Sequence, residues 1–302
     1  MKCTLCPRLC GVDRSVGRGY CGAGEGLRAA RAALHFGEEP CISGMRGSGT
    51  VFFSGCTLRC VFCQNSEISA GNHGWETTPE QLAARLLQLQ ETGAHNINFV
   101  TPTHYYPAIR ETLACAGSAL SIPCLANTGG YERVETVTEY ADLFNIWMPD
   151  LKFFSSSLSA RYLAAPDYFE KAARAILTMR RLAGPPVYND EGILVSGVLV
   201  RHLVMPGARA DSLALIDWLG ANFGPEDIVI SLMSQYLPLG RASDFPEINR
   251  RVTTYEYRCV ENALADKGFR TVYTQSRLSA TAEYVPAWDG EGIRQQTPEK
   301  LF

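Results

Sequence analysis

From residue 50 onward, short β-branched or aromatic runs alternate with longer amphipathic stretches. This pattern is typical of βα units whose strands form a parallel sheet. The predicted strands cover residues 50–54, 96–100, 123–127, 143–148, 197–204 and 227–232, with a further strand at 270–274. The predicted helices lie near 79–92, 105–117, 131–140, 158–183, 211–222 and 247–268. The sequence therefore predicts an α/β fold with six parallel βα units.

Composition and charge narrow the class of protein. The 302 residues are 46% hydrophobic and 20% charged, which suits one large α/β domain with a small appendage. A net charge of -3 argues against a nucleic-acid partner. The most apolar stretch, 193–205, is interrupted by Arg201 and His202, so no membrane partner is expected. Without an apolar segment after Met1 that could serve as a signal peptide, the sequence predicts a cytoplasmic protein.

Cysteines mark the candidate chemistry. Eight of the eleven lie within the first 63 residues, and Cys56, Cys60 and Cys63 follow the first predicted strand with C-x3-C-x2-C spacing. Three thiolates on one loop can hold three irons of a 4Fe-4S cube and leave the fourth iron without a protein ligand. A zinc site and a set of buried thiols are the alternatives, although three cysteines without a nearby fourth suit zinc poorly.

Four further cysteines precede this loop. They are Cys3, Cys6, Cys10 and Cys21. Four sulfurs are enough for a closed site, which is the habit of structural zinc and also of electron-transfer 4Fe-4S clusters. The spacing alone does not separate these two metals. We therefore divide the chain into a cysteine-rich metal-binding segment, 1–45, and a larger domain, 46–302.

Polar residues follow or end most of the predicted strands. They are Thr101, Thr103, His104, Asn127, Thr128, Asp150, Lys152, Arg201 and Gln235. In barrels of βα units the chemistry lies at the carboxyl ends of the strands, so these side chains are expected on one rim. The structural alternatives are a rim ion pair for Asp150 and Lys152, another ion pair for Arg201, and a helix cap for His104.

The three-cysteine run resembles the signature of radical S-adenosylmethionine (SAM) enzymes, and residues 43–69 resemble the glycine-rich lead-in and cluster loop of pyruvate formate-lyase activating enzymes. More narrowly, the chain is similar to homologues of the pyruvate formate-lyase activating enzyme. Asn127-Thr128-Gly129 stands where that family has Asp-Thr-Asn-Gly, and residues 148–152 where it has Met-Leu-Asp-Leu-Lys. The resemblance implies an open partial (β/α)6 barrel, a 4Fe-4S cluster with one open iron, and SAM chelating that iron.

The resemblance also implies roles near the cofactor. Asn127, Thr128, Met148 and Asp150 would hold a monovalent cation beside the SAM carboxylate, and Lys152 would contact the cofactor. Arg201, Gln235 and Tyr236 are candidates for cofactor and substrate contacts.

One strand end departs from the family pattern. The family commonly has Gly-Gly-Glu against the SAM amino group, whereas this chain has Thr101-Pro102-Thr103-His104. Backbone carbonyls and the hydroxyl of Thr101 or Thr103 can accept hydrogen bonds there instead. For His104, a cofactor contact and a helix cap are equally open interpretations.

The N-terminal cysteines also differ from the family pattern. Activating enzymes with extra ferredoxin clusters usually carry eight cysteines after the cofactor loop, whereas here four precede it. That difference favours zinc or a rubredoxin-like single metal at Cys3, Cys6, Cys10 and Cys21 over a second cluster.

The resemblance implies a function. A one-electron donor such as flavodoxin or ferredoxin would reduce the cluster, and SAM would be cleaved to methionine and a 5'-deoxyadenosyl radical that abstracts hydrogen from the substrate. Because water would quench that radical, a protein or peptide loop closing the barrel mouth is the favoured substrate, with a glycyl radical enzyme as one candidate. The alternatives are radical modification of another peptide or a small molecule, and a catalytically idle, metal-stabilised module that binds protein or RNA.

Overall fold

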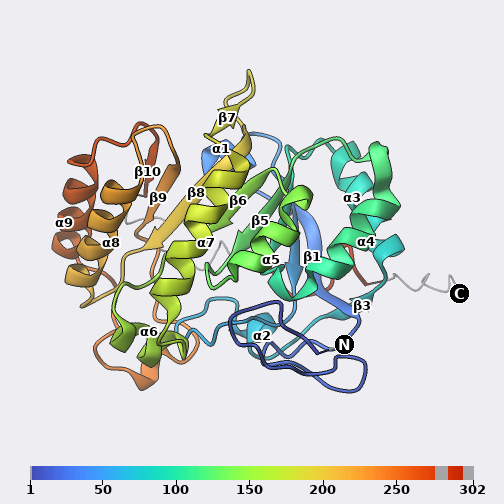
Figure 1. Ribbon diagram of the computed structural model, residues 1–302, viewed down its shortest axis with the longest axis horizontal. Helices are drawn as coiled ribbons and strands as arrows, with labels where there is room; N and C mark the ends of the chain where they lie inside the picture. Colours follow the sequence, from blue (N-terminus) through green and yellow to red (C-terminus); the bar gives the residue numbers. More distant parts are fainter. Residues whose placement is uncertain (1, 276–284, 295–302) are drawn as a thin grey trace, which may run out of the picture.

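The computed structural model describes residues 2–275 and 285–294 of the chain. One sheet runs through them in the strand order β10-β9-β8-β6-β5-β4-β2-β1-β3, with β7 paired to β8 at the side (Figure 1). In chain order the strands are β1 (Leu27–His35), β2 (Ser48–Phe53), β3 (Trp75–Thr77), β4 (Ile97–Val100), β5 (Cys124–Thr128), β6 (Ile146–Pro149), β7 (Val187–Tyr188), β8 (Leu194–Leu203), β9 (Val229–Met233) and β10 (Val272–Thr274). Neighbours from β2 to β10 pair in parallel.

Helices form the return connections between these strands, as Figure 1 shows. They are α1 (Pro40–Ser43), α2 (Ser66–Ser69), α3 (Pro79–Glu91), α4 (Tyr106–Ala116), α5 (Val134–Glu139), α6 (Ser156–Leu163), α7 (Tyr168–Ala183), α8 (Arg209–Asn222) and α9 (Thr254–Ala265). The start of α3 is well defined, because Thr78 and Gln81 form a reciprocal capping box and Pro79 occupies the first turn. The α/β class and the open parallel sheet expected of a partial barrel are confirmed.

Three local expectations were wrong. The single helix predicted over 158–183 is two helices, because Ala164 ends α6 in the left-handed conformation (φ 54°) and Pro166 follows. No element is predicted between the helix that ends at residue 183 and the strand that begins at 197, but this stretch contains the short strand β7, which pairs back onto β8. Strand β1 was not predicted, since its sequence is dominated by alanine and arginine and its pairing with β2 depends on tertiary context.

The central strands are buried on both faces, as expected of a parallel sheet covered by helices. Every residue of β4, β5 and β6 is buried. Trp147 and Phe99 contact the Phe144 ring edge to face, and Phe99 stacks against Phe53 at 6.1 Å between ring centroids. This packing holds the strand ends in fixed relative positions, which is what a site at the rim requires.

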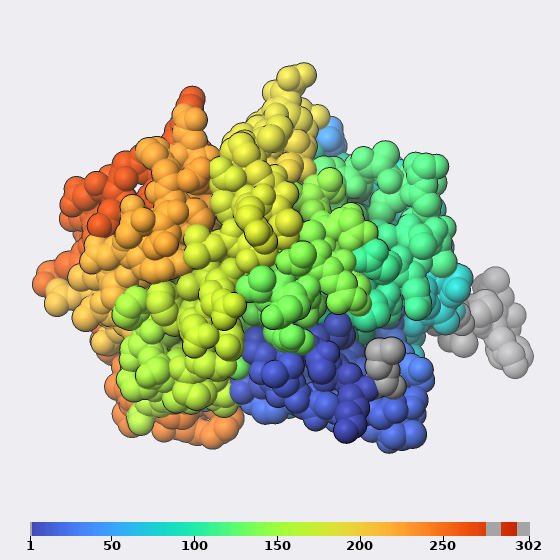
Figure 2. Space-filling view, in the orientation of Figure 1, coloured from blue at the N-terminus to red at the C-terminus, as the bar shows by residue number. Residues whose placement is uncertain are grey.

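The N-terminal residues lie against the edge of the sheet at which the three-cysteine loop follows β2. Figure 2 shows the dark-blue start of the chain packed below the green helices. The segment then continues into β1, which joins the sheet beside β2. The predicted division at residue 45 stays a prediction, and residues 276–284 and 295–302 of the larger unit lie outside the described residues. Among the helices that the structure describes, none has the length and apolarity needed to span a membrane.

Candidate active site

A pocket of about 190 Å³ opens at the carboxyl ends of the parallel strands. It brings together most of the residues predicted from the sequence. They are Cys56, Cys60, Cys63, Thr101, Asn127, Thr128, Asp150, Lys152, Arg201 and Gln235. Segments far apart in the chain thus supply thiols and charged groups to one cavity, as the position of these residues after parallel strands predicts.

The three-cysteine loop begins directly after β2. Burial raises the pKa of the Cys56 thiol to about 11 and raises that of Cys60 further. The Leu58 backbone N–H lies 3.4 Å from the Cys56 sulfur, and the Cys63 sulfur lies 3.3 Å from the Ser69 hydroxyl oxygen. Since thiolates are the form that binds iron, loading this loop must release protons.

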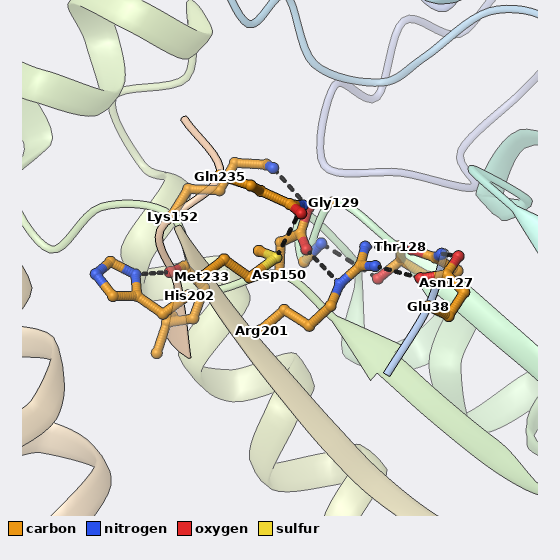
Figure 3. Close-up of polar contacts among 12 residues, drawn as sticks. Glu38, Asn127, Thr128, Gly129, Asp150, Lys152, Arg201, His202, Met233 and Gln235 are labelled. Carbon is orange, nitrogen blue, oxygen red and sulfur yellow. Dashed lines mark hydrogen bonds and ion pairs between the residues drawn. The ribbon is translucent and has the colours of Figure 1, made fainter. Parts of the chain in front are cut away.

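Across the pocket, Arg201 is the centre of an ion-pair network (Figure 3). Its Nε donates to Asp150 Oδ1 at 3.0 Å, its Nη2 to Asn127 Oδ1 at 2.6 Å, and its Nη1 to Glu38 Oε2 at 3.0 Å. Lys152 Nζ donates to the other oxygen of Asp150 at 2.6 Å. Two cations and two carboxylates therefore balance their charges at the wall of the pocket.

Burial and pairing act in opposite directions on these groups. Burial opposes ionisation of Asp150, but Lys152 and Arg201 outweigh it and lower its pKa. Burial also opposes the charges on Lys152 and Arg201, and Asp150 again outweighs it and raises both pKa values. All three side chains consequently stay charged at neutral pH, which suits a site for a ligand carrying carboxylate and ammonium groups.

The loops that carry Asp150 and Lys152 are fixed by a tyrosine and a glycine. Tyr168 Oη, from α7, donates to the backbone oxygen of Asp150 at 2.7 Å and accepts from the Lys152 backbone N–H at 3.1 Å. Gly130 has a φ of +78°, and a Cβ there would lie 2.1 Å from the Asp150 backbone oxygen. The close approach of the two strand ends thus requires glycine at 130.

The expected monovalent cation does not fit this arrangement. Both oxygens of Asp150 already accept from Lys152 and Arg201, and Asn127 Oδ1 accepts from Arg201. The Thr128 hydroxyl accepts from the Gly130 backbone N–H. A metal ion would need the same oxygens and would have to displace the side-chain cations that already balance these carboxylates.

The end of β4 is arranged differently from the expectation. Thr101 lines the pocket with φ +58°, which is unusual for a β-branched residue. Thr103 and His104 do not line it, because a 3-10 turn over Thr103–Tyr105 directs both into the interior. Thr103 donates to Glu132 at 2.6 Å, and His104 Nε2 bonds to the Ser54 carbonyl at 2.9 Å.

Glu38 was missed by sequence reasoning. It lies just before α1, 163 residues from its partner Arg201, and its carboxylate also accepts from the side chains of Asn98 and Asn127. No strand or helix pattern marks it, and only the pair of adjacent acids Glu38-Glu39 ahead of Pro40 could have drawn attention to it.

The N-terminal cysteines stand apart from the pocket. Cys6 and Cys21 are buried, Cys3 is half-buried and Cys10 is exposed. Among the described residues, no three or more His, Cys, Asp and Glu side chains are already grouped to hold a metal ion, and this applies to both cysteine sets. The metal predicted for Cys3, Cys6, Cys10 and Cys21 therefore stays a prediction.

Comparison with known proteins assigns the family. Residues 50–219 match the model of the radical SAM superfamily, a span that includes the three-cysteine loop, Asp150, Lys152 and Arg201. An uncharacterized protein of Methanocaldococcus jannaschii is 30% identical over 273 residues, which are 87% of this chain and 73% of that protein. The chain belongs to the radical SAM superfamily.

Solved structures to which the chain is similar include two from bacteria. SuiB of Streptococcus suis, solved with S-adenosylmethionine, is 15% identical with a TM-score of 0.47 and covers 78% of this chain. A domain of a pyruvate formate-lyase activating enzyme from Bacteroides vulgatus is 15% identical with a TM-score of 0.34, over 66% of this chain and 91% of that domain. This chain spans about half the length of the SuiB chains, between 46% and 52%.

Proposed function

We propose that this protein is an iron-sulfur enzyme that reductively cleaves SAM and abstracts hydrogen from a protein or peptide substrate. Membership of the radical SAM superfamily implies the 4Fe-4S cluster and SAM. One observation carries the assignment of residues: the three thiols of the cysteine loop and the Arg201 network open into the same pocket. When bound, the cluster would supply the one electron that cleaves the carbon-sulfur bond of SAM to methionine and a 5'-deoxyadenosyl radical.

The residues of this chain have distinct tasks in that reaction. Cys56, Cys60 and Cys63 would hold three irons as thiolates and leave one iron for SAM. Lys152 and Arg201, whose charges are fixed by Asp150, present positive charge to the SAM carboxylate. Side-chain N–H donors thus take the place beside the carboxylate that a monovalent cation would occupy.

Neutral groups complete the pocket. Asn127, Thr128 and Gln235 line it with amide and hydroxyl groups that orient SAM by hydrogen bonds. Thr101 offers a hydroxyl where the family commonly has a glutamate, and it is the candidate acceptor for the SAM ammonium group. We do not carry Thr103 and His104 into this set, since both are bonded within the interior.

Cleavage of SAM tests this proposal. The protein is reconstituted anaerobically, reduced with dithionite and supplied with SAM, and 5'-deoxyadenosine is quantified by chromatography. We expect turnover in the natural protein and none in a Cys56→Ala, Cys60→Ala, Cys63→Ala variant. Cys115→Ala is the matched control, because Cys115 is exposed on α4 and outside the pocket. Full iron loading without cleavage would favour the idle binding module instead.

A protein or peptide substrate is favoured because the radical must be shielded from water. A glycyl radical enzyme is one candidate, and its activation would give a glycyl radical signal in electron spin resonance after incubation with the reduced protein and SAM. Absence of that signal, with SAM cleavage intact, would favour another peptide or a small molecule.

The partners and the location complete the proposal. We propose flavodoxin or ferredoxin as the one-electron donor and the cytoplasm as the compartment, because reduced thiols and iron-sulfur clusters persist there. Reduction of the reconstituted protein by either donor, monitored by bleaching of the visible iron-sulfur absorption, tests the first of these.

A further inference from the structure

The carboxylate of Glu38 contacts Arg201 without lining the pocket. Its Oε2 accepts from Arg201 Nη1 at 3.0 Å, and its Oε1 accepts from Asn98 Nδ2 at 2.9 Å and from Asn127 Nδ2 at 3.2 Å. Arg201 and Asn127 line the pocket, whereas Glu38 and Asn98 do not. Figure 3 shows Glu38 on the opposite side of the guanidinium group from Asp150. Glu38 can therefore influence a ligand in the pocket only through the residues that it contacts.

Glu38, Asn127 and Arg201 form a closed ring of hydrogen bonds. Asn127 donates to Glu38 through Nδ2, and its Oδ1 accepts from Arg201 Nη2 at 2.6 Å. Together with the bond from Nε to Asp150, the guanidinium group is held at each of its nitrogens. These bonds use three of its five N–H groups, and Arg201 lines the pocket, so the other two can bind a ligand there. The ring thus fixes the direction of those two N–H groups.

The backbone around Glu38 is fixed by a short polar network. The Glu38 N–H donates to the Ser43 hydroxyl oxygen at 3.2 Å, and that hydroxyl donates to the His35 carbonyl at 3.3 Å. Asn96, which directly precedes β4, donates through Nδ2 to the Ile42 carbonyl at 2.8 Å. The segment that carries Glu38 is therefore bonded both to itself and to the start of a central strand.

Helix α1 anchors this segment against the sheet. Cys41 and Ile42 are buried in one hydrophobic cluster with Leu125 of β5 and with Ile146 and Met148 of β6. Figure 1 places α1 at the opposite end of the sheet from α2, which follows the three-cysteine loop. The segment therefore packs under the strands whose carboxyl ends form the pocket.

We propose that Glu38 is a positioning residue for SAM: it holds the guanidinium group of Arg201 in the orientation that binds the SAM carboxylate. This inference rests on the proposed function, in which Arg201 contacts that carboxylate. Glu38 lies outside residues 50–219, the span that matches the superfamily model, so a segment that precedes the matched domain contributes to the site. Without Glu38, the guanidinium group is free to turn toward Asp150, where it would compete with Lys152 for the carboxylate oxygens.

A positioning role and a purely electrostatic role predict opposite effects. Glu38 places a negative charge beside Arg201, so removing that charge alone would strengthen the binding of the SAM carboxylate. Removing the acceptor that holds Arg201 would weaken it. A glutamine at 38 would offer one acceptor oxygen and one NH2 group to three donors, so at least one contact would be lost. The direction of the change in SAM affinity therefore separates the two roles.

The SAM affinity of Glu38→Gln is the main test. The natural protein and the variant are reconstituted anaerobically to equal iron content, and SAM binding is measured by isothermal titration calorimetry, which does not require turnover. We expect the dissociation constant to rise about tenfold, as is usual when a residue that orients a ligand-binding group is replaced. The KM for SAM should rise with it, while the rate of 5'-deoxyadenosine formation at saturating SAM is retained. Unchanged or tighter binding would overturn the proposal. No SAM binding by the natural protein would instead contradict the proposed function.

Glu191→Gln is the matched control. The Glu191 carboxylate pairs with Arg46, which follows α1, at 3.3 Å, and both side chains are about half exposed. This variant removes the same charge from the surroundings of α1 but leaves Arg201 untouched, so we expect unchanged SAM affinity. Equal weakening in Glu191→Gln and Glu38→Gln would show that the anchoring of the α1 segment, and not the contact with Arg201, affects binding.

A second background tests whether Glu38 acts through Arg201. In Arg201→Met, measured with tetramethylammonium as the only monovalent cation, the guanidinium group is gone. Adding Glu38→Gln should then weaken SAM binding no further, because coupled residues do not have additive effects. Additive losses in the double variant would contradict the positioning role.

Glu38→Asp covers the case in which Glu38→Gln fails to fold. It keeps the negative charge, but its carboxylate is one methylene shorter and no longer reaches from Arg201 to both Asn98 and Asn127. We expect weaker SAM binding in this variant as well. The affinity of the natural protein in Glu38→Asp would show that the charge alone is enough and would overturn the proposal.

Discussion

Strands β4 and β6 end at the same edge of the sheet, but the residues that follow them make different contacts. After β6, Asp150 and Lys152 extend into the pocket, where Arg201 of β8 joins them. After β4, Thr103 and His104 turn into the interior and bond to Glu132 and Ser54. Placement after a parallel strand therefore predicts where a residue lies, but the conformation of the next few residues decides what it contacts.

The difference has a physical origin in the connecting backbone. The chain after β4 turns at Thr101, whose φ is +58°, and enters a 3-10 turn at Thr103. Arg14 donates to the backbone carbonyl of His104. The chain after β6 continues extended, with Asp150 still bridged to Arg201 across the sheet. An extended strand end directs alternate side chains at the rim, whereas a tight helical turn brings them back over the core.

Arg201→Met should give the largest effect on the β6 side. It leaves Glu38 without its buried cation and Asp150 with Lys152 alone, and breaking such a pair costs roughly 3–5 kcal/mol of the free energy of unfolding. SAM affinity should fall as well. Urea unfolding and calorimetric SAM titration measure the two effects. Arg110→Met is the control, because its exposed pair with Asp142 should be worth about 1 kcal/mol or less. Equal costs for both variants would contradict the network.

Glu132→Gln should change the pH dependence on the β4 side. Burial raises the pKa of Glu132 from 4.5 to about 8, partly offset by the bond from Thr103. Between these values the unfolded chain loses the proton that the folded protein keeps, so stability falls as pH rises, by at most about 1.4 kcal/mol per pH unit. The variant should lose this slope. A stability difference between the two proteins that stays constant from pH 5 to 8, in urea unfolding, would rule out a buried neutral Glu132.

Most of the sheet was predictable because its strands follow simple rules. The runs that became β2, β4, β5, β6, β8 and β9 are rich in apolar and β-branched residues, and most of their residues are buried. Strand β1 carries no such signal, and its alanines become buried only through pairing with β2. Its existence is a consequence of tertiary contacts that a local pattern does not contain.

The residues of the candidate site also fall into those that the sequence places and those that it does not. Convergence of Asp150, Lys152 and Arg201 follows from the strand pattern alone, because parallel strand ends share one edge. Glu38 could not be placed, since it precedes a four-residue helix outside the predicted units. Nor could the backbone hydrogen bond between Cys21 and Cys56, which depends on the left-handed turn at Gly55.

His104→Ala should separate stability from binding. Its Nε2–H group satisfies the Ser54 carbonyl in the interior, and burial lowers its pKa to about 4, so the ring is neutral at pH 7. Removing the donor should cost about 1–3 kcal/mol of unfolding free energy. The SAM dissociation constant of the reconstituted protein should not change. Weaker SAM binding without loss of stability, in the same two measurements, would instead restore His104 to the pocket.

The smallest effect is expected on exchanging the monovalent cation, which should leave SAM affinity unchanged. This experiment tests the role of Arg201 most directly. Replacing K⁺ by Na⁺ or tetramethylammonium at constant ionic strength should leave SAM affinity unchanged, because the oxygens of Asp150 and Asn127 are held by side-chain cations. In Arg201→Gln the positive charge is lost, and those oxygens together with Glu38 become a cluster of donors suited to a hard cation. Dependence on K⁺ should then appear in the variant only. If the natural protein already required K⁺ for SAM binding, a metal ion and not Arg201 would supply the charge beside the carboxylate.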